Sequence, residues 1–410
     1  MDENRNKKLI EPRTLPGFRD FLPAEAKKRQ WLRERLSKIC ESWGYDPMET
    51  PTLETLELFA GQIGEDEKLF FKFKDNGGRD VALRYDQTVP SVRVVAGNLN
   101  SLAKPFKRYQ IQPAFRAEKP QKGRYREFIQ CDADIFGDPT PYADAETIAL
   151  SLDIYRQLGF KEAKVLINDR TLLKDFPYEA IVSIDKIKKV GEEGVIREMV
   201  AKGIDASKAR EYLVIVKNLK PNETIKIILD YLTSLGFDRS WFEFDQTIAR
   251  SFSYSQGPIW EVVIPGFTSG SVLGGERYDG LFSKLFNMDY YGTGFGLGFD
   301  RTLEAADQFQ LIPKEATASK LLVTVFSPAL FTKSLEFSKS FRDQGINCEI
   351  YSNPNAKLDK QLKYADQKGI PYVIIIGPDE AAKGLVTVKN LKTKTQSTVS
   401  FFDALRLTNG

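Results

Sequence analysis

Histidine is absent from this sequence of 410 residues, and cysteine is scarce. Without histidine, a Ser-His-Asp triad, an imidazole general base and a histidine-ligated metal are all excluded. Any catalysis must therefore rest on arginine, lysine, aspartate, glutamate or tyrosine. The three cysteines, Cys40, Cys131 and Cys348, are widely separated and odd in number. They argue against a disulfide framework or a zinc knuckle, and we expect core thiols.

The sequence also lacks a long apolar run. Its first residues, MDENRNKKLIEPR, are charged, and we expect a cytoplasmic protein with no membrane association. Hydrophobic residues make up 42% and charged residues 28%, which is ordinary for a globular protein. A chain of this length exceeds the size at which a single core stops growing, so two or three domains are expected.

One segment, from Phe115 to Gly137, concentrates charges of both signs: FRAEKPQKGRYREFIQCDADIFG. We predict a strand, a turn and a strand along which cations and carboxylates alternate. Guanidinium groups in such a hairpin could stabilise the charge that develops when a carboxylate attacks the α-phosphate of ATP. The carboxylates could receive an amine or a metal ion. An adenylating enzyme fits this pattern; the alternative is a solvated hairpin with cross-strand ion pairs.

This charged segment closely resembles motif 2 of the class II aminoacyl-tRNA synthetases, in the form found in histidyl-tRNA synthetases. A predicted helix over residues 24–43, followed by a strand ending near a proline, resembles motif 1 of that class. Residues 292–306, GTGFGLGFDRTLEAA, resemble motif 3. A dinucleotide-binding fingerprint does not fit these glycines, because their spacing is GxGxG and no following strand ends in a ribose-binding acid.

The resemblance implies an α+β class II catalytic domain, an antiparallel sheet flanked by helices, formed by residues 1–170 and 237–310. Residues 171–236 are rich in helix formers and in Lys and Glu, and would form a helical insertion domain. In residues 320–410 short strands alternate with amphipathic helices, which predicts an α/β domain with a mixed or largely parallel sheet. Within it, KYADQKGIPYVIIIGPDE resembles the anticodon-binding domain of several synthetases.

The resemblance also implies the residues that bind ATP. Arg116 and Arg301 would clamp the phosphates and the adenine, and Arg124 would meet the β- or γ-phosphate. Glu118 would read the adenine amino group or help to hold Mg²⁺. Arg250 would contact the α-phosphate, so Arg116 and Arg250 are the predicted catalytic residues.

The amino-acid side of the site is implied in the same way. Asp86 lies in LRYDQTVP, which resembles a stretch whose acid receives the substrate α-amino group. Its alternative interpretation is an N-cap for a helix beginning near Val89. Gln130 would contact polar groups of the amino acid, and Asp134 would orient the imidazole.

Three further positions complete the implied site. Tyr278 would flank the substrate side chain, and Tyr254 is a second predicted amino-acid-binding tyrosine. Gln121 lies in the loop that, in the family, touches the acceptor end of tRNA.

Two stretches depart from the family pattern. Residues 250–257 read RSFSYSQG where the family has RGLDYYTG, so Ser253 replaces an acid and Ser255 replaces a tyrosine that helps to fix the imidazole. Glu276 replaces the glycine expected directly before Arg277. Loss of a polar partner costs on the order of 1 to 3 kcal/mol. Glu276 could form a salt bridge with a nearby arginine or accept the imidazole N–H.

The resemblance implies a homodimeric histidine–tRNA ligase that uses ATP and Mg²⁺ and acts on histidine and tRNA(His). One alternative is a non-catalytic paralogue, such as the synthetase-like regulatory subunit of ATP phosphoribosyltransferase. The complete C-terminal segment counts against it, because those paralogues commonly lack a full anticodon-binding domain. The other alternative is an adenylating enzyme for a different amino acid, favoured by Ser253, Ser255 and Glu276.

Overall fold

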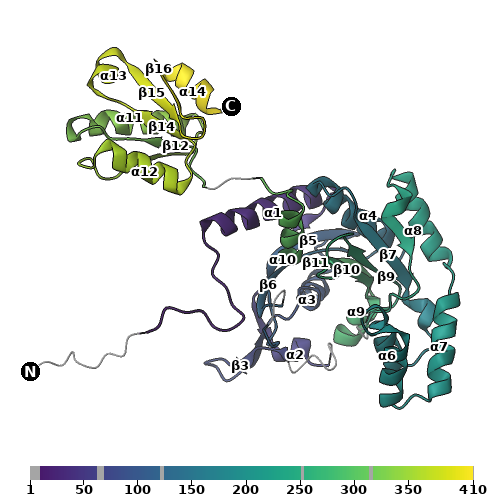
Figure 1. Ribbon diagram of the computed structural model, residues 1–410. Coiled ribbons are helices and arrows are strands. Elements are labelled where there is room, and N and C mark those ends of the chain that lie inside the picture. Colours follow the sequence, from purple (N-terminus) through teal and green to yellow (C-terminus); the bar gives the residue numbers. More distant parts are fainter. Residues whose placement is uncertain (1–9, 62–68, 121–123, 251–253, 314–316, 410) are drawn as a thin grey trace, which may run out of the picture. The chain divides into compact units, whose positions relative to one another are not determined.

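The computed structural model describes residues 10–61, 69–120, 124–250, 254–313 and 317–409. The chain forms two compact units, shown in Figure 1. The first unit comprises residues 1–20 and 31–312, and the second comprises residues 21–30 and 313–410.

An eight-stranded sheet forms the centre of the first unit. Its strands are β1 (Asp46–Pro47), β5 (Phe106–Phe115), β6 (Glu127–Phe136), β7 (Lys164–Asp169), β8 (Phe242–Phe244), β9 (Pro258–Val263), β10 (Leu273–Arg277) and β11 (Gly292–Gly298). They lie in the order β1-β5-β6-β11-β10-β9-β7-β8. All neighbours from β5 to β7 pair antiparallel, whereas the two edge pairs, β1 with β5 and β7 with β8, are parallel.

The sheet has one apolar face and one polar face, because successive side chains of a strand point to opposite sides. In β6, Cys131, Ala133 and Ile135 are buried in the main hydrophobic core, while Asp132 and Asp134 alternate with them. The helix α4 (Pro141–Leu158) covers the apolar face, where it contacts β6, β7, β9, β10 and β11. The opposite face is therefore left for charged side chains.

Other helices complete both sides of the sheet. Buried residues of α1 (Pro23–Ser42), α8 (Glu223–Ser234) and α10 (Phe299–Gln308) join the main core. A second core includes residues of α2 (Leu56–Phe59), α3 (Thr88–Asn98) and α9 (Asp279–Phe286). A small antiparallel sheet in the order β2-β4-β3 is formed by β2 (Leu53–Thr55), β3 (Lys72–Lys74) and β4 (Asp80–Leu83).

The helical stretch expected over residues 171–236 packs in two parts. A core of its own is shared by η2 (Arg170–Leu173), α5 (Tyr178–Ile184), α6 (Ile187–Ala201) and α7 (Ala206–Asn218). The helix α8 instead packs on α4 through its apolar face, with Ile225, Ile228 and Leu232 fully buried. The short η3 (Arg239–Trp241) then leads into β8. The insertion boundaries themselves stay a prediction.

The charged hairpin differs in one respect from the sequence-based expectation. We expected the charges to alternate along the strands, but β5 ends at Phe115 and β6 begins at Glu127. Arg116, Glu118 and Arg124 therefore lie in the connection rather than on the strands. The connection contains Pro120, which has no N–H to donate, so a ladder of backbone hydrogen bonds cannot continue unbroken through it.

The second unit contains a five-stranded mixed sheet in the order β13-β12-β14-β15-β16. Its strands are β12 (Leu321–Val323), β13 (Cys348–Ile350), β14 (Tyr372–Ile375), β15 (Leu385–Asn390) and β16 (Thr395–Ser400). β12 pairs parallel with β13 and β14, and the remaining pairs are antiparallel. Its helices are η4 (Pro328–Leu330), α11 (Phe331–Asp343), α12 (Leu358–Lys368), α13 (Pro378–Lys383) and α14 (Phe401–Asn409). This alternation of strands and helices confirms the predicted α/β architecture.

Two smaller expectations concern cysteine and the membrane. Cys40 and Cys131 are buried thiols, and Cys348 is half-buried. None of the helices in the described ranges is both long enough and apolar enough to cross a lipid bilayer.

Packing at Gly275 gives a first testable prediction. A Cβ atom there would lie 2.2 Å from the ring of Trp260, a fully buried side chain. We expect Gly275→Ala to lower the free energy of unfolding by about 1–3 kcal/mol, because the core must shift to admit the methyl group. Urea unfolding followed by tryptophan fluorescence would measure this, since all four tryptophans, Trp31, Trp43, Trp241 and Trp260, lie in the first unit.

The matched control is Gly97→Ala in α3, where an added Cβ would meet nothing within 4 Å. This change should leave stability unchanged or raise it by up to about 1 kcal/mol, because alanine restricts the unfolded chain. Equal unfolding midpoints for the two variants would contradict the packing argument.

Candidate active site

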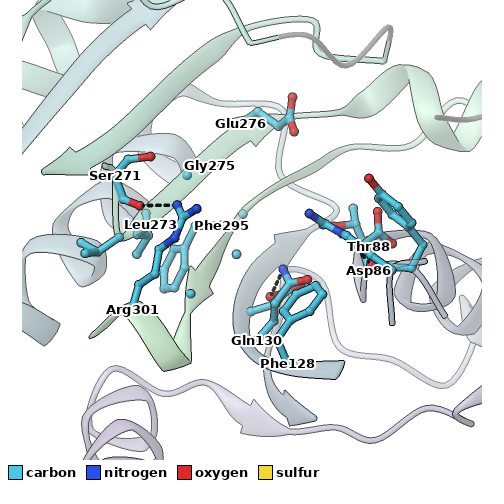
Figure 2. A pocket seen from close by; sticks show the side chains of 18 of the residues that line it. Asp86, Thr88, Phe128, Gln130, Ser271, Leu273, Gly275, Glu276, Phe295 and Arg301 are labelled. Carbon is cyan, nitrogen blue, oxygen red and sulfur yellow. Dashed lines mark hydrogen bonds between the residues drawn. The ribbon is translucent and has the colours of Figure 1, made fainter. Parts of the chain in front are cut away.

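A cavity of about 630 Å³ lies on the polar face of the eight-stranded sheet. All the predicted site residues within the described ranges line it, and Gln121 lies outside those ranges. The lining residues among those predicted are Asp86, Arg116, Glu118, Arg124, Gln130, Asp134, Arg250, Tyr254, Tyr278 and Arg301. In Figure 2, Arg301 and Asp86 lie on opposite sides of the cavity, and Glu276 projects from the sheet between them.

Glycines in β11 make room for the acids of the neighbouring strand. Gly294 lies opposite Asp134, and Gly296 lies opposite Asp132. A Cβ atom at Gly294 would lie 1.9 Å from Asp134 Oδ1, so no other residue leaves space for this carboxylate. The glycines of β11 therefore leave space for the buried side chains of β6 and for a bound ligand.

Asp134 is held from two sides. Arg108 Nη2 lies 2.5 Å from Asp134 Oδ2, and the Tyr278 hydroxyl donates a hydrogen bond to Asp134 Oδ1. Burial raises the pKa of Asp134, while Arg108 and the Tyr278 hydrogen bond oppose that rise. This carboxylate is positioned to accept a hydrogen bond from a polar ligand group.

Arg108 was missed by the sequence-based prediction. Its side chain is fully buried, and it lies directly opposite Asp134 in the register of β5 and β6. One sequence signal could have indicated Arg108. It is an arginine in a predicted half-buried strand, next to the strand that carries Asp134. The pairing depends on the register of the strands, which the sequence alone does not give.

Asp86 is buried at the far side of the cavity. Burial raises the pKa of its carboxyl group to about 6, although the Val89 N–H and the Arg116 charge oppose this. The Val89 N–H donates to Asp86 Oδ1 at 3.3 Å, although the N-cap residue of α3 is Gln87 rather than Asp86. Gln130 Oε1, also buried, has no hydrogen-bond partner within the described part of the chain. An ammonium group could satisfy both oxygens.

Cations gather around the connection between β5 and β6. The Arg116 guanidinium lies 4.2 Å from the Tyr85 ring centroid and 5.0 Å from that of Phe128. Arg124 Nη1 lies 3.5 Å from Glu118 Oε2.

Arg301 belongs to the same group of cations. Its Nη1 donates to the Ser271 carbonyl at 3.0 Å. Burial lowers the pKa of Arg301, and the charges of Arg124 and Arg116 lower it further. Three cations whose fields overlap favour an anion with several charges, such as a polyphosphate.

Arg250 lies between two carboxylates. Its Nη2 is 3.6 Å from Glu276 Oε1, and its Nη1 is 3.7 Å from Glu261 Oε1. The Ser255 hydroxyl donates to Glu276 Oε2. The salt bridge expected as one possibility for Glu276 is therefore confirmed, whereas Ser253 lies outside the described residues.

An antiparallel sheet with helices packed on it, joined to a separate α/β unit, defines the fold of a class II aminoacyl-tRNA synthetase. The family model described as "Histidyl-tRNA synthetase" matches residues 17–193, and that described as "Anticodon binding domain" matches residues 320–407.

Individual relatives agree with this class. Histidine–tRNA ligases from Cytophaga hutchinsonii and Aeropyrum pernix are 34% and 37% identical to this chain, over 96% and 92% of it and 98% and 93% of their own lengths. The crystal structure of histidyl-tRNA synthetase from Nostoc sp. PCC 7120 gives a TM-score of 0.83 at 26% identity, covering 98% of this chain and 99% of its own. The chain belongs to the histidyl-tRNA synthetase family.

The buried pair of Arg108 and Asp134 gives a second prediction. Replacing Arg108 with methionine would leave the Asp134 carboxylate buried beside Asp132 without its cation. We expect the free energy of unfolding to fall by about 3–5 kcal/mol, the usual cost of breaking a buried ion pair. The measurement is again urea unfolding monitored by tryptophan fluorescence.

The control for this prediction is Lys74→Met, which removes an ion pair of similar length, 2.8 Å to Asp80, whose side chains are both more than half exposed. Its effect should stay within about 1 kcal/mol. A loss of stability in Arg108→Met no larger than that of the control would refute the importance assigned to the buried pair.

Proposed function

We propose that this chain ligates histidine to tRNA(His) through a histidyl-adenylate formed from ATP. The observation that carries the proposal is a single cavity lined both by arginines and by buried carboxylates. The arginines Arg116, Arg124 and Arg301 suit the phosphates and the adenine of ATP. The acids Asp86 and Asp134 suit the two nitrogen-bearing parts of histidine.

In the first step, the histidine α-ammonium group would bind ionised Asp86 and the Gln130 amide oxygen. The imidazole would donate to Asp134, whose orientation is fixed by Arg108 and Tyr278. Tyr254 lines the same part of the cavity. These contacts would hold the substrate carboxylate ready to attack, which lowers the entropic part of the barrier.

The chemistry then centres on the α-phosphate. A histidine carboxylate oxygen forms a bond to the α-phosphorus, and the bond from that phosphorus to pyrophosphate breaks. Arg250 and Arg116 would stabilise the negative charge that accumulates during this exchange. In the second step, the 2′ or 3′ hydroxyl of the tRNA terminal adenosine takes the acyl group, and AMP leaves. Contact of Gln121 with the tRNA acceptor end stays a prediction.

Mg²⁺ would enter with ATP, where it neutralises phosphate charge. Glu118 lines the cavity beside Arg124 and could complete the coordination of Mg²⁺. Over the residues that are described, no cluster of three metal-binding side chains exists. That arrangement suits Mg²⁺, which is usually held by one or two carboxylates together with substrate phosphates and water.

Assembly and partners are also part of the proposal. We expect a homodimer, because the helix and strand near the start of the chain resemble motif 1. The second unit would bind the anticodon of tRNA, consistent with the family model that matches it. That complete unit makes a regulatory paralogue of ATP phosphoribosyltransferase the weaker alternative. A location in the cytoplasm stays a prediction.

The proposed activity is tested by ATP–pyrophosphate exchange with each of the twenty amino acids. We expect exchange with histidine alone. Arg250→Ala should reduce this exchange by at least about 10²-fold, because the charge at the α-phosphate would lose a preorganised donor. Arg342→Ala, in the second unit, is the control and should leave the exchange rate unchanged.

Two outcomes would contradict the proposed activity, and a third would contradict the role of Arg250. Exchange with a different amino acid would indicate altered specificity, and no exchange at all would favour the non-catalytic paralogue. Full exchange in the Arg250→Ala protein would refute only the role given to Arg250.

The raised pKa of Asp86 gives a further prediction. Ionised Asp86 is the form that binds an ammonium group, and burial raises its pKa to about 6. The value of kcat/KM for histidine should therefore rise with pH through about 6, because this ratio reports the ionisation of the free enzyme. Asp86→Asn should lower kcat/KM and remove this rise from whatever activity remains. A wild-type profile that is flat across this range would contradict the assignment.

A further inference from the structure

Glu276 and Ser255 are two of the described positions at which this chain departs from the family pattern. Each is buried, with 6% and 5% of its surface exposed. They also contact each other, since the Ser255 hydroxyl donates to the Glu276 carboxylate. Where the family pattern has a glycine and a tyrosine, this chain places a long acid in contact with a small alcohol.

The strands around Glu276 determine where the Arg250 guanidinium lies. Gly274 is two residues before Glu276 on β10, and it lies opposite Glu261 on β9. A Cβ atom at Gly274 would lie 2.3 Å from Arg250 Nη1. The guanidinium therefore occupies the space above Gly274, with one carboxylate on each side of it.

The pKa of Arg250 shows the electrostatic effect of the two carboxylates on this arginine. Burial by itself would lower the pKa of Arg250, but Glu276 and then Glu261 outweigh it, and the net shift is upward. Burial raises the pKa of Glu276, and Arg250 is the largest influence against that rise. Burying a carboxylate costs free energy unless the carboxylate is paired with a cation, so Glu276 and Arg250 stabilise each other.

We propose that Glu276, oriented by Ser255, is a positioning residue that fixes the Arg250 guanidinium over Gly274 for contact with the α-phosphate. Arginine loses side-chain rotamer entropy when it is immobilised. A guanidinium that is already held would not incur this cost when ATP reacts. This inference rests on the proposed function, because it assigns Arg250 to the adenylation step.

The test is histidine-dependent ATP–pyrophosphate exchange by the full-length protein and its variants. We expect Glu276→Gln to lower kcat by about 10-fold or more while KM for histidine stays within about 2-fold, the pattern of an interaction used in the transition state. Glu276→Asp, which keeps the charge, should recover part of kcat. Ser255→Ala should change kcat in the same direction by a smaller factor.

Two comparisons separate positioning from a general structural effect. Glu243→Gln is the matched control, because Glu243 is also an ion-paired strand glutamate of the same sheet, 2.6 Å from Lys164, but about half exposed. It should leave kcat and KM unchanged. Combining Glu276→Gln with Arg250→Lys should cost much less than the product of the two single effects, since coupled residues are non-additive.

Other results would overturn the proposal. An increase in KM for histidine at unchanged kcat, with altered discrimination against ring-methylated histidines, would make Glu276 an imidazole acceptor instead. Unchanged kinetics in Glu276→Gln and Ser255→Ala would refute any role. If the Glu276→Gln protein does not fold, the Ser255→Ala protein provides the test. A normal kcat in that variant would refute the proposal. An inactive wild-type protein would refute the proposed function itself, which is a distinct outcome.

Discussion

Buried charge on one face of an antiparallel sheet is the constraint on which the rest of the structure depends. A strand that alternates apolar and acidic residues must send its carboxylates to the face opposite the core, where they need partners and space. Arg108 supplies the partner for Asp134, and Gly294 supplies the space. The helix α4 covers the apolar face because Cys131, Ala133 and Ile135 require it. One alternation therefore places both the core and the cavity.

The cavity brings both signs of charge together, which is what an adenylating site requires. Its arginines include Arg116 and Arg124 in the connection after β5 and Arg301 on α10, and its acids come from that connection, from β6 and β10, from α10 and from the turn before α3. Arg250 is the only cation of the predicted site that we find flanked by two carboxylates within the described ranges. A ligand with an ammonium end and a reacting carboxylate, together with ATP, would find partners of both signs in this one cavity.

Sequence reasoning predicted the class of fold and the residues that line the cavity, because these depend on local motifs of fixed spacing. It could not predict Arg108, whose importance arises from a register between β5 and β6. It also placed Arg116 and Glu118 on a strand, whereas Pro120 breaks the regular pattern there. For Glu276 the sequence offered two partners, and only packing selected Arg250. Motifs indicate which residues gather, and tertiary contacts decide which of them pair.

The two departures at Ser255 and Glu276 are best understood as one change. They are 21 residues apart in the chain but share a hydrogen bond in the site. Glu276 brings a carboxylate to Arg250, and Ser255 donates a hydrogen bond to that carboxylate. In the proposed site, Ser255 thus replaces a tyrosine that would contact the amino acid, and with Glu276 it positions Arg250, which would contact ATP.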